Sequence, residues 1–209
     1  MTGETGPADE RLRATLSGRR IVLGVSGGIA AYKAVEVCRR LVDAGAFVSP
    51  VLTEDAQRFI GATTFSALAS EPARTSLFNG PEPIPHTLLG QRADVVVVAP
   101  ATAKLIGKYA AGISDDLLTA TLLATRAPVV VCPAMHTEMW EHPATRENVA
   151  KLSKFGYRIW GPVKGPLASG RVGMGRLMEP DEIVSRALAA LNPRSSSARG
   201  QVLPLASGR

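Results

Sequence analysis

The sequence predicts an α/β fold with three layers, in which a doubly wound parallel sheet carries helices on both faces. First, short β-branched runs alternate with helical stretches along most of the chain, and right-handed crossovers make such strands parallel neighbours. Second, two runs are apolar almost throughout, "ADVVVVAPA" and "APVVVCPAM", as strands buried on both faces must be. Third, no repeat or linker interrupts the pattern, so we expect one domain.

The first expected strand is residues 20–25, which are mainly aliphatic and β-branched. The helix after it, residues 30–45, has apolar positions at helical spacing and a glycine as its stop signal. A second strand follows at residues 46–53, and two short helical stretches are expected at residues 56–61 and 64–70.

Strands and helices continue to alternate along the rest of the chain. The central strand of the expected sheet is the first of the two apolar runs. The expected strands are residues 93–101 and 127–135, and the expected helices are residues 103–112, 115–125, 143–156 and 179–191. The helix at 143–156 leads to residues 157–162, "YRIWGP".

Length and composition set the domain boundaries. A chain of 209 residues with 45% hydrophobic content is long enough for one sizeable core. We expect a flexible segment at residues 1–18, a single domain at 19–191 and a disordered basic tail at 192–209. The tail holds three arginines and no acid, about half of the formal charge of +6. No stripe of Lys and Arg with aromatics remains, so we expect no nucleic-acid partner.

The cysteine count and the chain's beginning indicate a compartment. With only two cysteines, Cys38 and Cys132, the sequence implies neither a disulfide framework nor a cysteine metal site, and we expect no metal. The first residues are polar and acidic, unlike a signal peptide, and no apolar run approaches membrane-spanning length. These features predict a soluble, cytoplasmic protein without a membrane partner.

A glycine turn follows the first strand, at the sheet edge where doubly wound folds bind ligands. Gly27 and Gly28 allow backbone amides to approach an anion, Ser26 adds a hydroxyl, and a helix N-terminus follows. The spacing is neither G-x-G-x-x-G nor a Walker A loop, which argues against NAD and ATP. A phosphate site and a tight turn that merely needs glycine both remain open. Thr53, after the second strand, is a possible further phosphate ligand.

The two apolar strands end alike, with a proline and small residues. Pro100 to Thr102 follow one strand, and Ala134 with Met135 follow the other. Small side chains at neighbouring strand ends leave room for a flat ring system, and exposed amides there can hydrogen-bond a heterocycle. Ordinary loop chemistry explains either segment alone, whereas the pair favours a shared planar ligand.

The chain has three histidines. His86 lies in a proline-rich loop ahead of the central strand, where a surface residue and a catalytic base are both possible. His136 follows the second apolar strand, in "PAMHTEMW". His142 precedes Pro143 at a helix start, so we expect a structural role for it.

These stretches together resemble one family. The chain is similar to the homo-oligomeric flavin-containing cysteine decarboxylases, which are Rossmann-like flavoproteins. They include the phosphopantothenoylcysteine decarboxylases of coenzyme A synthesis and the decarboxylases of peptides that end in cysteine. The similarity spans residues 21–191, and the matching stretches are "GVSGGIAAYK", the histidine before "ADVVVVAPATA", "GISDDLLTATLLA", "PAMHTEMW" and "LASGRVGMGRLMEP".

The resemblance implies FMN as cofactor, a homotrimer, and usually a dodecamer of four trimers with FMN at a subunit contact. It makes His86 the base, and it assigns the substrate to His136, Met139 and the clamp residues Ser169 and Gly170. The cofactor-binding residues that it implies are Ser26, Gly27, Gly28, Ile29, Thr53, Phe65, Pro100, Ala101, Thr102, Ala134 and Met135.

Two departures from the family pattern bear on the substrate. Ser169 stands where the coenzyme A enzymes usually have a proton-donating cysteine, and a hydroxyl is a much weaker acid than a thiol. The chain also ends soon after the closing helix, without the synthetase domain usual in bacterial coenzyme A enzymes. Both favour oxidative decarboxylation of a ribosomal peptide's C-terminal cysteine, giving an aminoenethiol for thioether macrocycle formation.

Two alternatives remain open: a 4′-phosphopantothenoylcysteine decarboxylase, and a regulatory subunit that binds flavin without catalysis. A further departure from the family pattern is His136, where the family has asparagine. An imidazole binds a carboxylate strongly only when protonated, which the carboxylate itself favours. We therefore expect His136 to bind the substrate carboxylate, and the alternative is that it only packs against Trp140.

Overall fold

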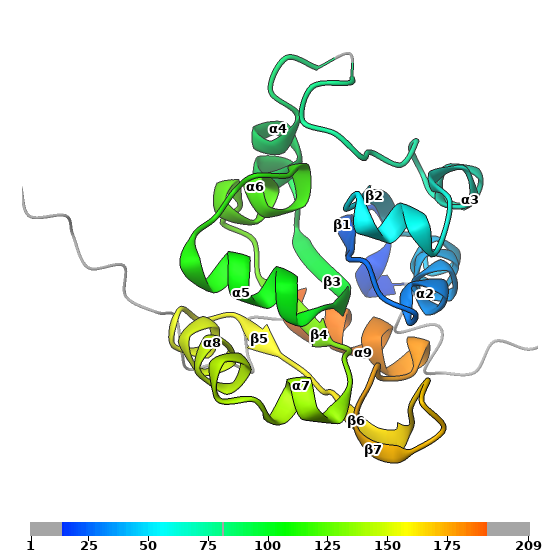
Figure 1. The fold of residues 1–209 in the computed structure, drawn as a ribbon. Coiled ribbons are helices and arrows are strands. Elements are labelled where there is room, and N and C mark those ends of the chain that lie inside the picture. Colours follow the sequence, from blue (N-terminus) through cyan, green and yellow to red (C-terminus); the bar gives the residue numbers. More distant parts are fainter. Residues whose placement is uncertain (1–13, 81, 192–209) are drawn as a thin grey trace, which may run out of the picture.

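A five-stranded parallel sheet forms the centre of the protein. The computed structural model describes residues 14–80 and 82–191 (Figure 1). The strands lie in the order β2-β1-β3-β4-β5, so the chain winds outward from the centre in two directions and reverses between β1 and β3. The predicted doubly wound sheet is therefore confirmed. The strands are β1 (Arg20–Val25), β2 (Phe47–Leu52), β3 (Val95–Ala101), β4 (Val129–Pro133) and β5 (Arg158–Ile159).

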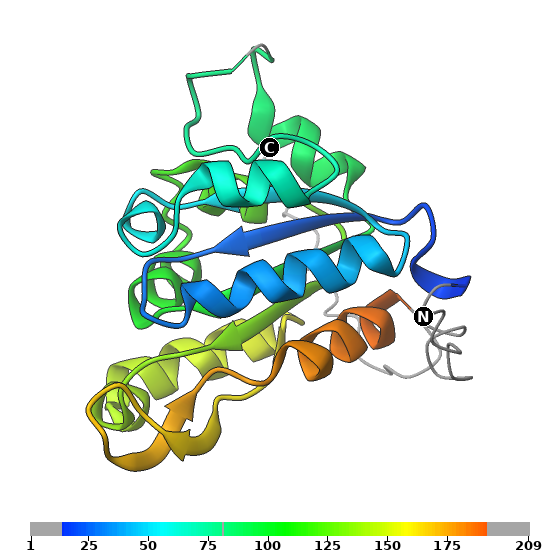
Figure 2. The same ribbon diagram turned by 90° about the vertical axis from the view of Figure 1, so that its right-hand side faces the viewer.

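Helices cover both faces of this sheet. Figure 2 looks from the side on which α2 and α9 lie across the strands. This face carries α2 (Ala31–Asp43), α3 (Ala62–Leu68) and α9 (Pro180–Leu191), and the other carries α4 (Pro85–Arg92), α5 (Ala103–Ala111), α6 (Leu117–Ala124) and α8 (Pro143–Lys154). Two further short helices are η1 (Asp55–Arg58) and α7 (Thr137–Glu141).

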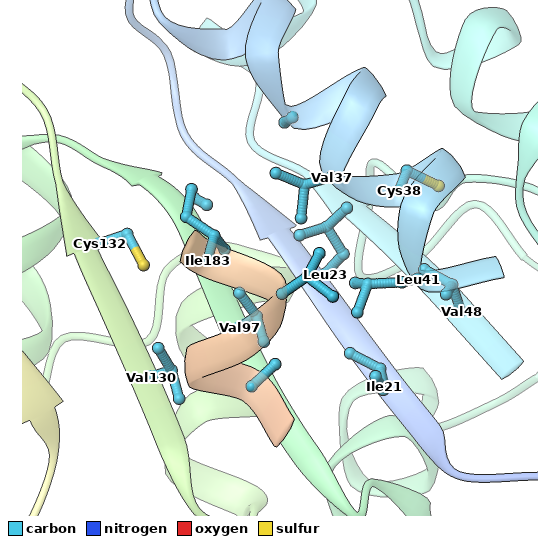
Figure 3. Packing of buried hydrophobic residues seen from close by; sticks show 14 of the residues in the cluster. Ile21, Leu23, Val37, Cys38, Leu41, Val48, Val97, Val130, Cys132 and Ile183 are labelled. Carbon is cyan, nitrogen blue, oxygen red and sulfur yellow. The ribbon is translucent and has the colours of Figure 1, made fainter. Parts of the chain in front are cut away.

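Alternate side chains of the strands supply two separate cores. In β3, Val95 and Val97 belong to the core under α2 and α9, whereas Val96 and Val98 belong to the opposite core. All four are fully buried, which explains why this strand has no polar position. Figure 3 shows the first core, where side chains of β1, α2 and α9 surround Val97.

Both cysteines belong to the first core and are free thiols (Figure 3). Burial raises the pKa of the Cys38 thiol to about 11 and, with a smaller contribution from the nearby Glu182 carboxylate, that of Cys132 to about 12. Neither thiol therefore loses its proton near neutral pH.

The segment around His86 differs from the expected proline-rich loop. It forms α4, which begins at Pro85, with the proline in its first turn. Proline suits that position because the first turn does not use its N–H. The prediction of a loop at His86 was therefore wrong.

Residues 163–176, which include the clamp residues Ser169 and Gly170, form a β-hairpin. The pattern of alternating strands and helices did not predict it. Its strands are β6 (Val163–Pro166) and β7 (Val172–Arg176), which pair antiparallel as a second, two-stranded sheet. Glycines at alternate positions of "VGMGR" conceal the strand pattern.

The described part of the chain begins before the predicted domain boundary at residue 19. Residues 14–16 are helical, and Leu16 is fully buried in the first core. The ordered domain therefore includes part of the segment 1–18 that was expected to be flexible, because Leu16 contributes apolar surface to the core. The remainder of that segment and the basic tail at residues 192–209 lie outside the described residues. No helix among those described is long and apolar enough to span a bilayer.

Candidate functional site

A cavity of about 570 Å³ lies beyond the carboxyl ends of β1, β3 and β4 and is closed on one side by the hairpin. It is at the edge where the strand order reverses, as expected for a doubly wound sheet. Predicted site residues that line it are Gly27, Gly28, Ile29, Pro100, Thr102, Ala134, Met135, His136 and Met139.

The glycine turn after β1 has no room for a side chain. A Cβ on Gly27 would lie 2.2 Å from the Cβ of Asp55, in the segment after β2. The helix that follows, α2, has no side-chain cap and no acidic residue in its first turn. Close backbone approach and an uncapped helix start suit an anion.

The Ser26 hydroxyl holds two strand ends together. It is buried, donates a hydrogen bond to the carbonyl of Pro100 (2.8 Å) and accepts one from the backbone N–H of Thr102 (2.9 Å). Its proton is thus engaged within the protein. Ser26 therefore fixes the turn that the sequence assigned to phosphate.

A smaller polar cavity of about 350 Å³ adjoins the first, and both are lined by Gly27, Thr102 and Lys104. Ser26 and Thr53, two residues predicted to hold the phosphate, also line it. Lys104 pairs with Asp55 at 2.5 Å. Lys108 also lines this cavity and pairs with Asp115 and Asp116, and Glu54 adds a fourth carboxylate. Because the lysines are engaged by carboxylates, the groups that suit the phosphate of a ligand such as FMN are the hydroxyls and the uncapped helix start, and the larger, mainly apolar cavity suits its flat ring.

Three polar side chains meet where the hairpin approaches the loop after β4. The Nδ1–H of His136 donates to the carboxylate of Glu138, and its Nε2 lies 2.8 Å from the Ser169 hydroxyl oxygen. The hydrogen bond from His136 is the largest cause that lowers the pKa of Glu138 below its ordinary value. Arg171 approaches the other carboxylate oxygen at 3.8 Å. The His136 side chain is 36% exposed, so it is open to the cavity and to solvent.

Glycines bring the hairpin into contact with this loop. A Cβ on Gly175 would lie 2.1 Å from the carbonyl oxygen of Met135, and one on Gly173 would lie 2.3 Å from the Thr137 hydroxyl. The backbone N–H of Met135 donates to the carbonyl of Gly175 (2.9 Å). Side chains at either glycine would move Ser169 away from His136.

The structure does not bring every predicted site residue to this cavity. His86 lies on α4, which Figure 1 shows at the opposite end of the molecule from β6 and β7. Its Nδ1 is buried and has no hydrogen-bond partner among the described residues. Phe65 and Ala101 are fully buried in the two cores, and Gly170 lies exposed at the hairpin turn.

His142 and Trp140 have structural contacts. The Nδ1 of His142 accepts a hydrogen bond from the backbone N–H of Ala144 at the start of α8 (3.2 Å), which confirms its predicted structural role. The ring of Trp140 faces the guanidinium of Arg146, 5.9 Å away. The side-chain partners of His136 are Glu138 and Ser169.

Several cavity residues were not selected from the sequence. Tyr32, Lys33 and Arg176 line the cavity, although all lie in quoted motif stretches. Lys33 pairs with Glu179 at 3.1 Å. Lys33 could have been selected from the sequence, because it lies in the first turn of the helix after the glycine turn. Helical side chains point toward the start of their helix, which here is the end of the strand. Glu138 also lies within "PAMHTEMW", and its position two residues after His136 was the signal that could have identified it.

Comparison with known proteins identifies relatives across nearly the whole described chain. The family model for Flavoprotein matches residues 9–192. The coenzyme A biosynthesis bifunctional protein CoaBC of Mycobacterium bovis is 53% identical over 169 residues, 81% of this chain and 40% of that protein. This chain therefore spans less than half the length of that relative.

Solved structures share the fold and part of the sequence. A PPC decarboxylase mutant complexed with pantothenoylaminoethenethiol superimposes with a TM-score of 0.72 and 32% identity, over 81% of this chain and 96% of that one. The FMN-dependent cysteine decarboxylase SpaF gives a TM-score of 0.71 and 32% identity, over 84% of this chain and 98% of that one.

Proposed function

Since this chain belongs to the Flavoprotein family, we propose that it is an enzyme that decarboxylates 4′-phosphopantothenoylcysteine, with FMN as its cofactor. The observation that carries the proposal is 53% identity over 169 residues to a coenzyme A biosynthesis protein. The sequence motifs alone favoured a peptide that ends in cysteine as the substrate. The comparisons support the coenzyme A alternative better, because similarity over the whole domain outweighs one serine in the clamp.

The two adjoining cavities fit FMN through residues of this chain. Gly27, Thr53 and Thr102 would hold the phosphate, with the start of α2 facing it. Pro100 and Met135, in the larger cavity, would lie against the flat ring. When bound, FMN supplies the electron sink that a cysteine carboxylate lacks.

The remaining cavity residues bind and orient the substrate. His136 binds the substrate carboxylate through its ring, and Glu138 orients that ring through Nδ1. Met135 and Met139 line the same cavity and exclude water from the reacting carbons. The hairpin completes the wall opposite the strand ends.

His86 requires a second copy of the chain to reach such a site. It lies on α4, which Figure 1 shows at the opposite end of the molecule from the hairpin beside the cavity, and its buried Nδ1 has no partner among the described residues. We propose that the protein assembles as a homotrimer, four of which form a dodecamer, and that His86 of one copy acts as base in the site of its neighbour.

One observation favours a peptide substrate as the second candidate. Ser169 replaces the clamp cysteine of the coenzyme A enzymes, and the structurally similar SpaF is an FMN-dependent cysteine decarboxylase. A peptide enzyme releases the enethiol and needs no clamp thiol. A binding subunit without catalysis has no comparable support, because the named relatives are decarboxylases or a biosynthetic enzyme.

Mass spectrometry of the FMN-loaded protein with each substrate separately tests the proposal. We expect 4′-phosphopantothenoylcysteine to lose CO2 only, and a short peptide ending in cysteine to remain unchanged. His136→Ala should raise KM by about tenfold or more, because it removes a charged hydrogen bond to the carboxylate. His142→Asn keeps a helix cap and is the matched control. Loss of CO2 and two hydrogens from the peptide alone would overturn the assignment.

A further inference from the structure

Lys104 occupies an unusual position at the start of a helix, beside both cavities. It is the second residue of α5, which begins directly after β3, and it lines the larger and the smaller cavity. The start of a helix carries partial positive charge, so a carboxylate is favoured there and a lysine is not. The first turn of α5 has no acidic residue that would offset this cost. A residue that breaks a local preference beside a ligand cavity is a candidate for a functional role.

Asp55 is the partner of Lys104 and comes from another segment of the chain. Its carboxylate lies 2.5 Å from the Lys104 ammonium, although the two residues are 49 positions apart in sequence. The hydrogen bond from Lys104 is the largest cause that lowers the pKa of Asp55 below its ordinary value. The Lys104 side chain is 62% exposed and that of Asp55 is 41% exposed. Exposed pairs add little to stability, so a contribution to the fold does not account for this lysine.

The turn after β1 brings Asp55 to the expected phosphate position. A Cβ on Gly27 would lie 2.2 Å from the Cβ of Asp55 and 2.6 Å from its carbonyl carbon. This contact fixes residue 55 beside the turn, and both residues line the polar cavity together with Thr53 and Thr102. The Asp55 carboxylate therefore borders the cavity in which the phosphate is expected. Two neighbouring anions repel each other, and a cation beside one of them reduces that repulsion.

The second lysine of the polar cavity cannot replace Lys104. Among the described residues, the charged side chains that line this cavity are Lys104, Lys108, Glu54, Asp55, Asp115 and Asp116. Lys108 lies one turn further along α5 and pairs with Asp115 at 2.7 Å and with Asp116 at 3.5 Å. Its charge is thus already shared between two carboxylates. Without Lys104, the Asp55 carboxylate would keep only the weaker interactions with Arg58 and Lys108.

We propose that Lys104 neutralises the Asp55 carboxylate so that the FMN phosphate can occupy the turn after β1. Lys104 is thus a positioning residue for the cofactor, because it acts on the phosphate through Asp55. The hydroxyls of Thr53 and Thr102 and the start of α2 remain the groups that hold the phosphate. This inference rests on the place proposed for the FMN phosphate and is independent of which substrate is decarboxylated.

The dissociation constant of FMN in four proteins tests the proposal: wild type, Lys104→Gln, Asp55→Asn and the double variant. Each FMN-loaded protein is equilibrated by ultrafiltration at a series of FMN concentrations, and flavin absorbance gives the bound fraction. Lys104→Gln should raise the dissociation constant by about tenfold, because the carboxylate beside the phosphate loses its cation. Asp55→Asn should not raise it. The double variant should return to within about threefold of wild type, because the charge that needed neutralising is gone.

Two controls separate charge from structure. Lys151→Gln makes the same change of charge on α8, where the Lys151 ammonium faces the Phe155 ring 5.9 Å away, and it should leave the dissociation constant unchanged. In about 1 M salt, the difference between Lys104→Gln and wild type should fall to about threefold or less, because exposed charges are screened. A lost packing contact would not respond to salt in this way.

The double variant gives the decisive result. If it binds FMN as weakly as Lys104→Gln, Lys104 binds the phosphate itself and the inference is overturned. An unchanged dissociation constant in Lys104→Gln would overturn it as well. The substrate assignment fails separately: if FMN-loaded wild-type protein removes no CO2 from 4′-phosphopantothenoylcysteine, the four dissociation constants still decide the role of Lys104.

Discussion

At Gly27, the absence of a side chain allows the turn after β1 to pack closely against the segment after β2. The backbone there approaches Asp55 so closely that any Cβ would overlap it. We expect Gly27→Ala to open the turn, cost about 1–3 kcal/mol of stability and weaken FMN binding by at least about tenfold. Absorbance of the flavin retained after ultrafiltration gives the dissociation constant directly.

Gly107→Ala is the matched control for that substitution. Gly107 lies within α5, and its Cβ would meet only the Asn148 amide nitrogen at 3.6 Å, an ordinary contact. Alanine should strengthen the helix by up to about 1 kcal/mol and leave flavin binding intact. Equal flavin retention in Gly27→Ala and Gly107→Ala would mean that the turn does not hold the phosphate.

Single residues were predictable where their partners are near in sequence. The helix-capping role of His142 follows from Pro143 beside it, and the structure confirms it. The contact between His136 and Ser169 was not predictable, because it depends on how a hairpin folds back across 33 residues. Burial of Phe65 likewise depends on tertiary packing under α2.

At the scale of elements, the packing of β7 on the loop after β4 determines the shape of the site. Gly175→Ala would place a methyl group against the Met135 carbonyl, at a glycine with φ +145°. We expect a loss of about 3 kcal/mol in the free energy of unfolding. Hydrogen exchange should also accelerate at the Met135 amide, which donates to the Gly175 carbonyl. Unchanged protection of that amide would show that the hairpin is held elsewhere.

The main elements were predictable because their signals are periodic. Strands β1 to β4 each lie within a predicted run, whereas the two-residue β5 was too short to be predicted as a strand. The apolar character of β3 and β4 follows from burial on both faces. The hairpin was not predictable, since its glycines are required by close packing and remove the side-chain alternation. Helix α4 was hidden by prolines, although Pro85 is favourable where the helix begins.

At the scale of the whole molecule, the separation of His86 from the cavity leads to a prediction about assembly. His86→Asn and His136→Ala should each reduce activity at low substrate concentration. Co-expression of the two variants should restore about a quarter of wild-type activity, because random association pairs an intact His86 with an intact His136 at one site in four.

The co-expression experiment needs a control showing that both variants are present in the same particle. Differently tagged chains, purified over both tags in turn, ensure that each particle contains both variants. If the mixed particles remain as inactive as the two single variants, the site is not shared between copies. That result would leave the role of His86 as base without support.

The central claim concerns the substrate, and direct competition tests it most sharply. FMN-loaded protein is mixed with equal concentrations of 4′-phosphopantothenoylcysteine and a cysteine-ended peptide, and mass spectrometry follows both as they are consumed. The ratio of their rates is the ratio of kcat/KM. We predict at least about 100-fold preference for 4′-phosphopantothenoylcysteine, with loss of CO2 alone. Preferential conversion of the peptide, with loss of CO2 and two hydrogens, would contradict the account.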